Sequence, residues 1–195
     1  MGNFRIYFTT DVHGSEKCFR KFVNAGKFYK ADVVILGGDI TGKMIIPLVE
    51  QPDGSYVAEC LGTKHTAKRQ EELQKIEELV RFTGFYPYRT NPKEMEELSA
   101  NPSKVDELFR RLIVENMRRW MKIADDNLKN TGIKCFITPG NDDRLDIDKV
   151  SEESGYVINP EGKLITLGNR FEMISTGWTN ITPWRAPREC CEEEL

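Results

Sequence analysis

The chain has 195 residues, a length that suits one domain with a substantial core rather than two domains. Hydrophobic residues make up 39% and charged residues 30%, a balance typical of soluble globular proteins that excludes a disordered or membrane-embedded chain. The net charge of −3 argues against a strong nucleic-acid-binding patch, and no apolar run reaches membrane-spanning length or resembles a signal peptide.

The first elements predict a strand–helix–strand unit. Residues 4–10 are rich in aromatic and β-branched side chains, as in a strand. Ser15 can cap a helix over 16–29, whose apolar residues fall on one face. Residues 33–36 are all apolar, the pattern of a strand covered on both faces. The segment therefore predicts two parallel strands joined by a right-handed helical crossover.

Residues 43–131 are predicted to form a mainly helical insertion within a single domain spanning 1–195. Such an insertion can form a lid over a site or buttress the core, and we expect a mixture of the two. A Pro-Asp-Gly turn at 52–54 predicts a hairpin, and the remaining periodicity predicts helices. The expected elements are hairpin strands at 44–49 and 56–60 and helices at 66–82, 92–98 and 103–130.

The last third of the chain alternates short apolar runs with turn residues. An apolar strand at 133–138 is followed by a short helix at 146–154. Closely spaced strands at 156–158, 163–167 and 171–175 predict a second sheet. Pro187 and the acidic residues after it favour the opening of a helix over 185–195.

Polar motifs follow three of the predicted strands. Asp11 and His13 follow the first strand, Gly38-Asp39 the second, and the run 140–143 (Gly-Asn-Asp-Asp) the strand at 133–138. Each motif alone is more simply explained as a turn or a helix cap. Because ligands bind at the carboxyl ends of strands in open α/β sheets, the three together predict one pocket. Oxygen ligands with one imidazole suit a divalent metal ion.

In this order, the motifs resemble those of the calcineurin-like metallophosphoesterase superfamily over residues 4 to about 178. The resemblance implies an α/β (α+β) fold, a four-layer αββα sandwich with mixed sheets. It also implies two divalent ions (Mn, Fe, Zn or Ni) and a phosphate ester substrate. The implied reaction is hydrolysis of a phosphodiester or phosphomonoester by a metal-bound hydroxide.

The resemblance assigns metal ligands residue by residue. Asp11 and His13 would hold the first ion, Asp39 would bridge both ions, and Asn141 would offer its amide oxygen to the second ion and to the substrate. A bridging carboxylate serves two ions, so Asp39 is expected to matter more for metal binding than Asp143, which would bind neither ion directly.

Three further residues are assigned around the site. Asp143 matches an acidic position of the family, where it is expected to orient a ligand by hydrogen bonding. Asp142 stands where the family most often has a histidine, and with Asp143 it is the candidate catalytic residue. Arg144 is the nearest cation to Asp142 and a candidate substrate contact. An ionised Asp142 would otherwise repel a phosphate group.

The chain lacks the family's last two histidine motifs. His65, the only other histidine, lies in the insertion and is expected at the surface. We therefore expect a fold incomplete at the C-terminus, at most one well-held ion, and reduced activity. Exposed apolar surface and an associating sheet edge are expected too, which leaves an oligomer open. The alternative function is a catalytically inactive metal-binding scaffold or interaction module.

The five cysteines show no metal-binding spacing. Cys135 lies in an apolar strand, where a buried free thiol is the simplest interpretation. Cys190 and Cys191 are adjacent, and a bridge between neighbours would be strained. This usage predicts free thiols and a reducing, cytoplasmic location.

Overall fold

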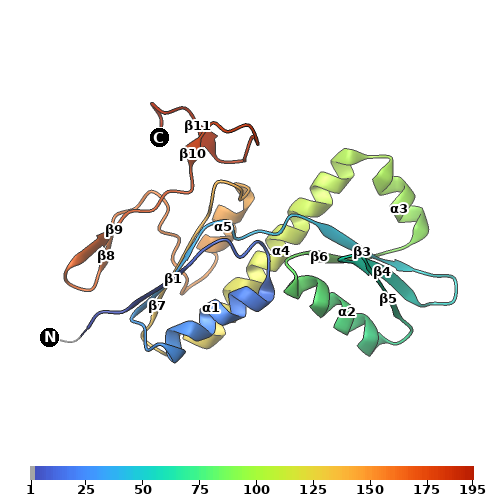
Figure 1. Cartoon of the computed structure of the whole chain (residues 1–195), viewed down its shortest axis with the longest axis horizontal. Coiled ribbons are helices and arrows are strands. Elements are labelled where there is room, and N and C mark those ends of the chain that lie inside the picture. The colour runs from blue at the N-terminus through green and yellow to red at the C-terminus, as the bar shows by residue number, and fades with distance from the viewer. Residues whose placement is uncertain (1–2) are drawn as a thin grey trace. The chain divides into compact units, whose positions relative to one another are not determined.

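A computed structural model describes residues 3–195 and divides the chain into two compact units (Figure 1). Unit 1 comprises His13 and the residues before it, Cys18–Thr41 and Val114–Leu195. Unit 2 comprises Gly14–Lys17 and Gly42–Ile113. The described residues form five helices and eleven strands in parallel, antiparallel and mixed sheets, an α+β protein as the sequence predicts.

The centre of unit 1 is a parallel sheet in the order β1-β2-β7. Its strands are β1 (Ile6–Thr9), β2 (Val33–Gly37) and β7 (Lys134–Thr138). Tyr7 pairs with Val34, and Val34 with Cys135, so all three strands run in register toward the same edge. The predicted strand–helix–strand unit is confirmed, because helix α1 (Glu16–Phe28) connects the parallel strands β1 and β2.

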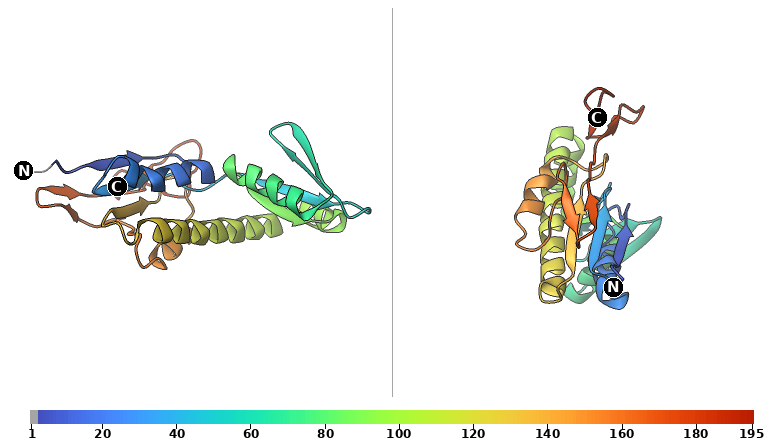
Figure 2. Two further views of the ribbon diagram at one scale, coloured as in Figure 1. Left: turned by 90° about the horizontal axis from the view of Figure 1, so that it is seen from below. Right: turned by 90° about the vertical axis from the view of Figure 1, so that its left-hand side faces the viewer.

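Helices cover one face of this sheet. Helix α1 and the part of α4 (Pro102–Leu128) that belongs to unit 1 run side by side (Figure 2), and the Phe19 ring stacks on Trp120 at 4.2 Å. A Cβ on Gly26 would lie 3.1 Å from the Val34 side chain, so a glycine lets α1 approach β2 closely. The long helix predicted at 103–130 is therefore confirmed.

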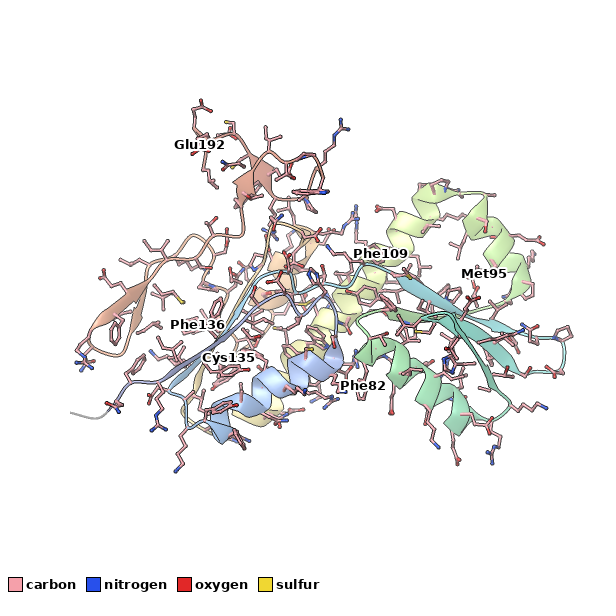
Figure 3. All side chains as sticks on the ribbon, in the orientation of Figure 1. Phe82, Met95, Phe109, Cys135, Phe136 and Glu192 are labelled. Atoms are coloured by element: carbon pink, nitrogen blue, oxygen red, sulfur yellow. The ribbon has the colours of Figure 1, made fainter. Side chains whose placement is uncertain are left out.

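The other face of the sheet is only partly covered. Successive side chains of a strand point to opposite faces of the sheet, so Cys135 and Phe136 of β7 lie on different faces (Figure 3). Both side chains are buried. Phe136 joins a cluster with Leu167 of the hairpin formed by β8 (Ile165–Leu167) and β9 (Phe171–Met173). Phe8 of the edge strand β1 is 60% exposed.

The second sheet predicted in unit 1 is thus reduced to a hairpin. The strand predicted at 156–158 forms only a single parallel bridge, between Ile158 and Phe136. Apolar surface such as Phe8 is exposed beside it, as the sequence led us to expect.

The prediction of a helix over 185–195 is wrong. This segment contains β11 (Glu189–Cys190), which pairs in parallel with β10 (Thr179–Asn180). The Glu189 carboxylate accepts a hydrogen bond from the Ala186 amide at 2.9 Å. The acidic residues suggested a helix N-terminus, but strand pairing and this side-chain bond satisfy the backbone groups instead.

Unit 2 is built on a four-stranded mixed sheet in the order β5-β4-β3-β6. The predicted hairpin, β3–β4, is confirmed, but strands β5 and β6 were not predicted. The helix expected from residue 66 begins at Gln70. Residues 66 and 67 pair with β4 instead, because strand pairing overrides their local helical preference. The elements are β3 (Ile45–Glu50), β4 (Tyr56–Cys60), β5 (Thr63–Ala67), β6 (Tyr86–Thr90), α2 (Gln70–Phe82) and α3 (Pro92–Ser99).

Two side chains show how unit 2 is closed. The Tyr86 hydroxyl accepts a hydrogen bond from the Gly42 amide at 2.7 Å, and the Tyr86 ring packs edge-on against Phe109. Pro87 is tolerated in β6 because this strand lies at the edge of the sheet. Unit 2 is therefore a packed α/β element, with more strand than the predicted insertion.

All five cysteines are free, as the sequence predicts. Cys135 is fully buried, and this burial raises the pKa of its thiol to about 12. Within residues 3–195, no helix is long and apolar enough to cross a lipid bilayer.

Candidate metal site

Three of the predicted ligands lie together at the carboxyl edge of the parallel sheet. One ligand atom from each of Asp11, His13 and Asp39 falls within 4.8 Å of the other two. His13 Nε2 is 3.7 Å from Asp11 Oδ1 and 3.9 Å from Asp39 Oδ2. The parallel register of β1 and β2 places their following loops at one edge, which brings these side chains together.

The backbone of these three residues is unusual. Six non-glycine residues in the described part of the chain have positive φ, and three of them are Asp11 (57°), His13 (41°) and Asp39 (48°). The left-handed region costs a non-glycine residue about 1–3 kcal/mol and is found preferentially at functional sites. The local strain is therefore concentrated on the candidate ligands.

Backbone hydrogen bonds fix the first two loops to each other. The Asp11 amide donates to the Gly38 carbonyl at 3.1 Å, and the His13 amide donates to the Asp39 carbonyl at 2.9 Å. In both bonds the donor lies in the loop after β1 and the acceptor lies in the loop after β2. These main-chain contacts fix the backbone of the loop that carries Asp11 and His13 to that of the loop that carries Asp39.

The loop after β7 reaches the same place. A Cβ on Gly140 would lie 2.2 Å from Asp39 Oδ1 and 2.3 Å from its backbone nitrogen, so only glycine fits beside this carboxylate. The Asp142 amide is 3.4 Å from Asp39 Oδ1. The three motif-bearing loops therefore converge on Asp39.

Asp143 joins two of these loops from a fully buried position. Its carboxylate accepts hydrogen bonds from the Ile40 amide (3.0 Å), the Thr41 amide (2.9 Å) and the Thr41 hydroxyl (2.7 Å). It also accepts one from the Gly140 amide at 2.8 Å. Asp143 thereby fixes the backbone directly after Asp39 to the turn that carries Asn141.

The remaining predicted residues follow Gly140 in the same turn. Asn141 and Asp142 are partly buried, and Asp142 makes the amide contact with Asp39 given above. Arg144 Nε is 3.3 Å from Asp146 Oδ2, so its guanidinium is engaged with the start of α5 (Asp146–Glu152). The metal role of Asn141 and the substrate role of Arg144 stay predictions.

The chemistry of the donors fits a divalent ion. Two ligands with bonds of about 2.1 Å can lie at most about 4.2 Å apart across one ion. The separations of 3.7 and 3.9 Å are within this limit, but they are too long for hydrogen bonds. The side chains of His13 and Asp11 are 42% and 57% exposed, which leaves the cluster accessible from solvent.

The two ring nitrogens of His13 have different surroundings. Its Nδ1 is buried, and no described atom forms a hydrogen bond with it. Its Nε2 faces two carboxylates at distances beyond hydrogen bonding. An ion held between His13 and these two carboxylates would bind Nε2, so it would leave the buried Nδ1 without a partner.

His65 lies on β5 in unit 2, opposite Ala58 of β4, and is partly buried. The structure therefore places the second histidine of the chain on a paired strand. It was expected at the surface, and pairing within the sheet accounts for its partial burial.

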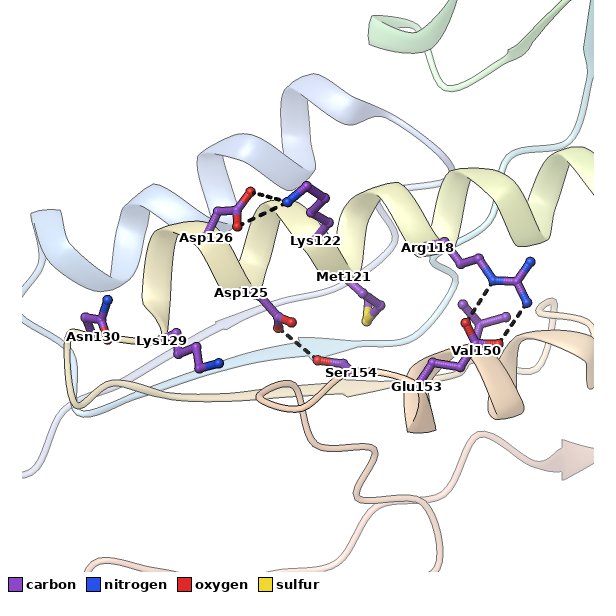
Figure 4. Close-up of a pocket in the computed structure, with 10 residues that line it drawn as sticks. All are labelled: Arg118, Met121, Lys122, Asp125, Asp126, Lys129, Asn130, Val150, Glu153 and Ser154. Carbon is purple, nitrogen blue, oxygen red and sulfur yellow. Dashed lines mark hydrogen bonds and ion pairs between the residues drawn. The ribbon is translucent and has the colours of Figure 1, made fainter.

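A separate groove of about 590 Å³ lies between α4 and α5 in unit 1 (Figure 4). Four of its charged side chains form two ion pairs, Arg118 with Glu153 and Lys122 with Asp126. Asp125 accepts a hydrogen bond from Ser154 at 2.9 Å. None of the candidate ligands lines this groove, so it is distinct from the metal site.

Two residues around the site were missed by sequence reasoning. Thr41 contributes an amide and a hydroxyl to Asp143, and Arg188 contacts the turn that contains Asn141 and Asp143. Thr41 could have been suggested by its place directly after the Gly-Asp motif. Arg188 lies in a segment predicted as a helix opening and carries no such signal.

No family model, curated protein or solved structure matches this chain. The interpretation of the site therefore rests on the geometry of its residues.

Proposed function

We propose that this protein is a metal-dependent phosphoesterase with a divalent ion held by Asp11, His13 and Asp39. The observation that carries the proposal is the convergence of these three side chains on strained backbone at the carboxyl edge of a parallel sheet. Structural turns do not require two carboxylates and an imidazole at such spacing. The mixture of oxygen and nitrogen donors suits Mn²⁺, Fe²⁺, Zn²⁺ or Ni²⁺.

A bound divalent ion would supply Lewis-acid chemistry, activating water and offsetting charge on a phosphoryl group. The protein's own residues would hold the ion and orient the loops around it. Asp143 fixes the Asp39 loop, and the turn after β7 presents Asn141 and Asp142 beside Asp39. Asn141 offers a neutral amide to the substrate or to a second ion, and Arg144 offers a cation for the phosphate group.

The resemblance in motif order supports the same proposal. The order of Asp11-x-His13, Gly38-Asp39 and the 140–143 run resembles that of calcineurin-like metallophosphoesterases, with Asp142 where that family most often has a histidine. We extend the proposal to a fold of that type, with the β1-β2-β7 sheet as one of its two layers. Phosphodiesters are the favoured substrates, because Asp142 replaces the histidine more often present at this position.

A second candidate is a metal-binding scaffold without turnover. Asp11 and Asp39 place two carboxyl groups beside a single imidazole, an arrangement that attracts a cation and disfavours an anionic ester. On this alternative, the protein binds manganese but does not hydrolyse phosphate esters.

The test is manganese-dependent hydrolysis of a chromogenic phosphodiester, bis(p-nitrophenyl) phosphate. We expect turnover that requires added Mn²⁺ and is abolished in His13→Gln. His65→Gln is the matched control, because it changes the only other histidine in the chain and should leave turnover unchanged. Manganese binding without turnover would favour the scaffold, and loss of turnover in both variants would contradict the assigned role of His13.

A further inference from the structure

Arg188 is buried behind the turn that follows β7, with 1% of its surface exposed. Its Nε donates to the Asp143 carbonyl at 2.9 Å, and its Nη2 donates to the Arg144 carbonyl at 3.2 Å. Its backbone amide donates to the Asn141 carbonyl at 3.1 Å. One residue from the C-terminal segment therefore holds three of the four carbonyls between residues 141 and 144.

The buried charge of Arg188 is compensated. Its Nη2 and Nη1 lie 2.6 and 3.2 Å from the two carboxylate oxygens of Asp148 in α5. A planar guanidinium can make this two-pronged contact and still donate to carbonyls through its remaining N–H groups. A lysine ammonium lacks that fork, so it cannot reproduce the set of bonds.

Arg188 is itself held in place by its own segment. Its carbonyl accepts a hydrogen bond from the Thr179 amide at 3.0 Å, as part of the β10–β11 pairing. The next residue, Glu189, closes the preceding loop through the Ala186 amide. The guanidinium thus projects from a structured element rather than from a free tail.

On its other side the same turn is fastened to the Asp39 loop. The Asp143 carboxylate binds the Ile40 and Thr41 amides, and Gly140 leaves no space beside Asp39. The turn that carries Asn141 and Asp142 is therefore held between two anchors. Asp143 provides the first anchor, and Arg188 provides the second.

We infer that Arg188 is a positioning residue of the candidate metal site: it fixes Asn141 and Asp142 next to Asp39. This inference rests on the proposed function, because it assigns Arg188 a role in metal and ester binding at that site. Arg188 acts through the main chain of the turn, including the carbonyl of Asn141. Replacing a residue that holds metal-binding residues in place typically changes metal affinity by about 10–100-fold.

The test compares Arg188→Lys with Arg185→Lys, which makes the same change at an exposed arginine three residues earlier. Manganese affinity is measured by electron paramagnetic resonance titration, and kcat and KM are measured on bis(p-nitrophenyl) phosphate. We expect Arg188→Lys to weaken manganese binding by about 10-fold or more and to raise KM, with Arg185→Lys unchanged. Hydrogen–deuterium exchange should be faster in the peptide covering residues 138–145 of Arg188→Lys.

Chemical rescue separates positioning from general destabilisation. In Arg188→Ala, added guanidinium ion at low millimolar concentration should restore manganese affinity, whereas urea at the same concentration should not. If the Arg188 variants do not fold, Asp148→Asn removes only the ionic partner of Arg188 and should weaken manganese binding in the same direction.

The outcomes are distinct. A folded Arg188→Lys protein with wild-type affinity, KM and exchange would overturn the inference while leaving the proposed function intact. Unfolded Arg188 variants together with wild-type manganese affinity in Asp148→Asn would overturn it as well. Wild-type protein that binds no manganese would overturn the proposed function first, and the inference with it.

Discussion

Replacing Asp143 with asparagine tests how the candidate site is held together. The buried carboxylate accepts four hydrogen bonds: Ile40 and Gly140 amides on one oxygen, and the Thr41 amide and hydroxyl on the other. Asparagine keeps the size of the side chain but turns one acceptor into a donor. If the NH₂ group of Asp143→Asn replaces the first oxygen, it faces the Ile40 and Gly140 amides. If it replaces the second oxygen, it faces the Thr41 amide and hydroxyl.

The cost can be worked out from these contacts. In the best orientation the amide oxygen keeps the Ile40 and Gly140 bonds, and the Thr41 hydroxyl rotates to accept from the new NH₂ group. The Thr41 amide is still left buried without an acceptor, at about 1–3 kcal/mol. The surviving bonds also lose their charge-assisted character. We therefore expect Asp143→Asn to lower the free energy of unfolding of unit 1 by about 3 kcal/mol.

The assay is urea denaturation of metal-free protein followed by tryptophan fluorescence. All three tryptophans, Trp120, Trp178 and Trp184, belong to unit 1, so the signal reports that unit alone. Asp126→Asn is the control, because Asp126 is an exposed carboxylate of α4 paired with Lys122, and such pairs contribute about 0.2–1 kcal/mol. A loss in Asp143→Asn no larger than in the control would refute the reasoning.

Two further predictions use the same protein. Gly140→Ala would bring a Cβ within 2.2 Å of Asp39 Oδ1, so it should weaken manganese binding at least about 10-fold by calorimetry. Gly155→Ala meets no atom within 4 Å and should bind as wild type, so equal losses in both variants would contradict the steric argument. Labelling with a thiol reagent at pH 8 should modify the exposed Cys18 and spare Cys135, whose pKa burial raises to about 12. Rapid labelling of Cys135 in folded protein would show that its strand opens easily.

The position of the site could be predicted because it depends on parallel-sheet geometry. Apolar runs identified the strands that became β2 and β7, and parallel strands bring their carboxyl ends to one edge. Polar residues placed directly after such strands must therefore lie close together. Asp11, His13 and Asp39 were found by this rule, without any information on their side-chain contacts.

The supports of the site could not be predicted, because they depend on contacts between distant segments. The hydrogen bonds from Arg188 to the turn after β7 join residues more than 40 positions apart. The burial of an arginine leaves no periodic pattern in a sequence. In unit 2, β5 and β6 form by pairing with β4 and β3, and local propensity at residues 66 and 67 favoured a helix instead.

The positive φ angles at the site were also beyond sequence reasoning. Asp and His tolerate the left-handed region better than most residues, but they adopt it only where surrounding contacts impose it. Here the Asp11 and His13 amides are bound to carbonyls of the opposite loop. The conformation of the ligands is thus a product of the assembled loops rather than of either loop alone.

The most direct test of the metal site is a manganese titration of wild-type protein and Asp39→Asn by isothermal calorimetry. Asp39 is the residue on which all three loops converge, so it should matter more than any other ligand. The proposal predicts one tightly bound ion per wild-type chain and no measurable binding in Asp39→Asn, with the fold of the variant retained by circular dichroism. Absence of binding in the wild type, or equal binding in the two proteins, would contradict it.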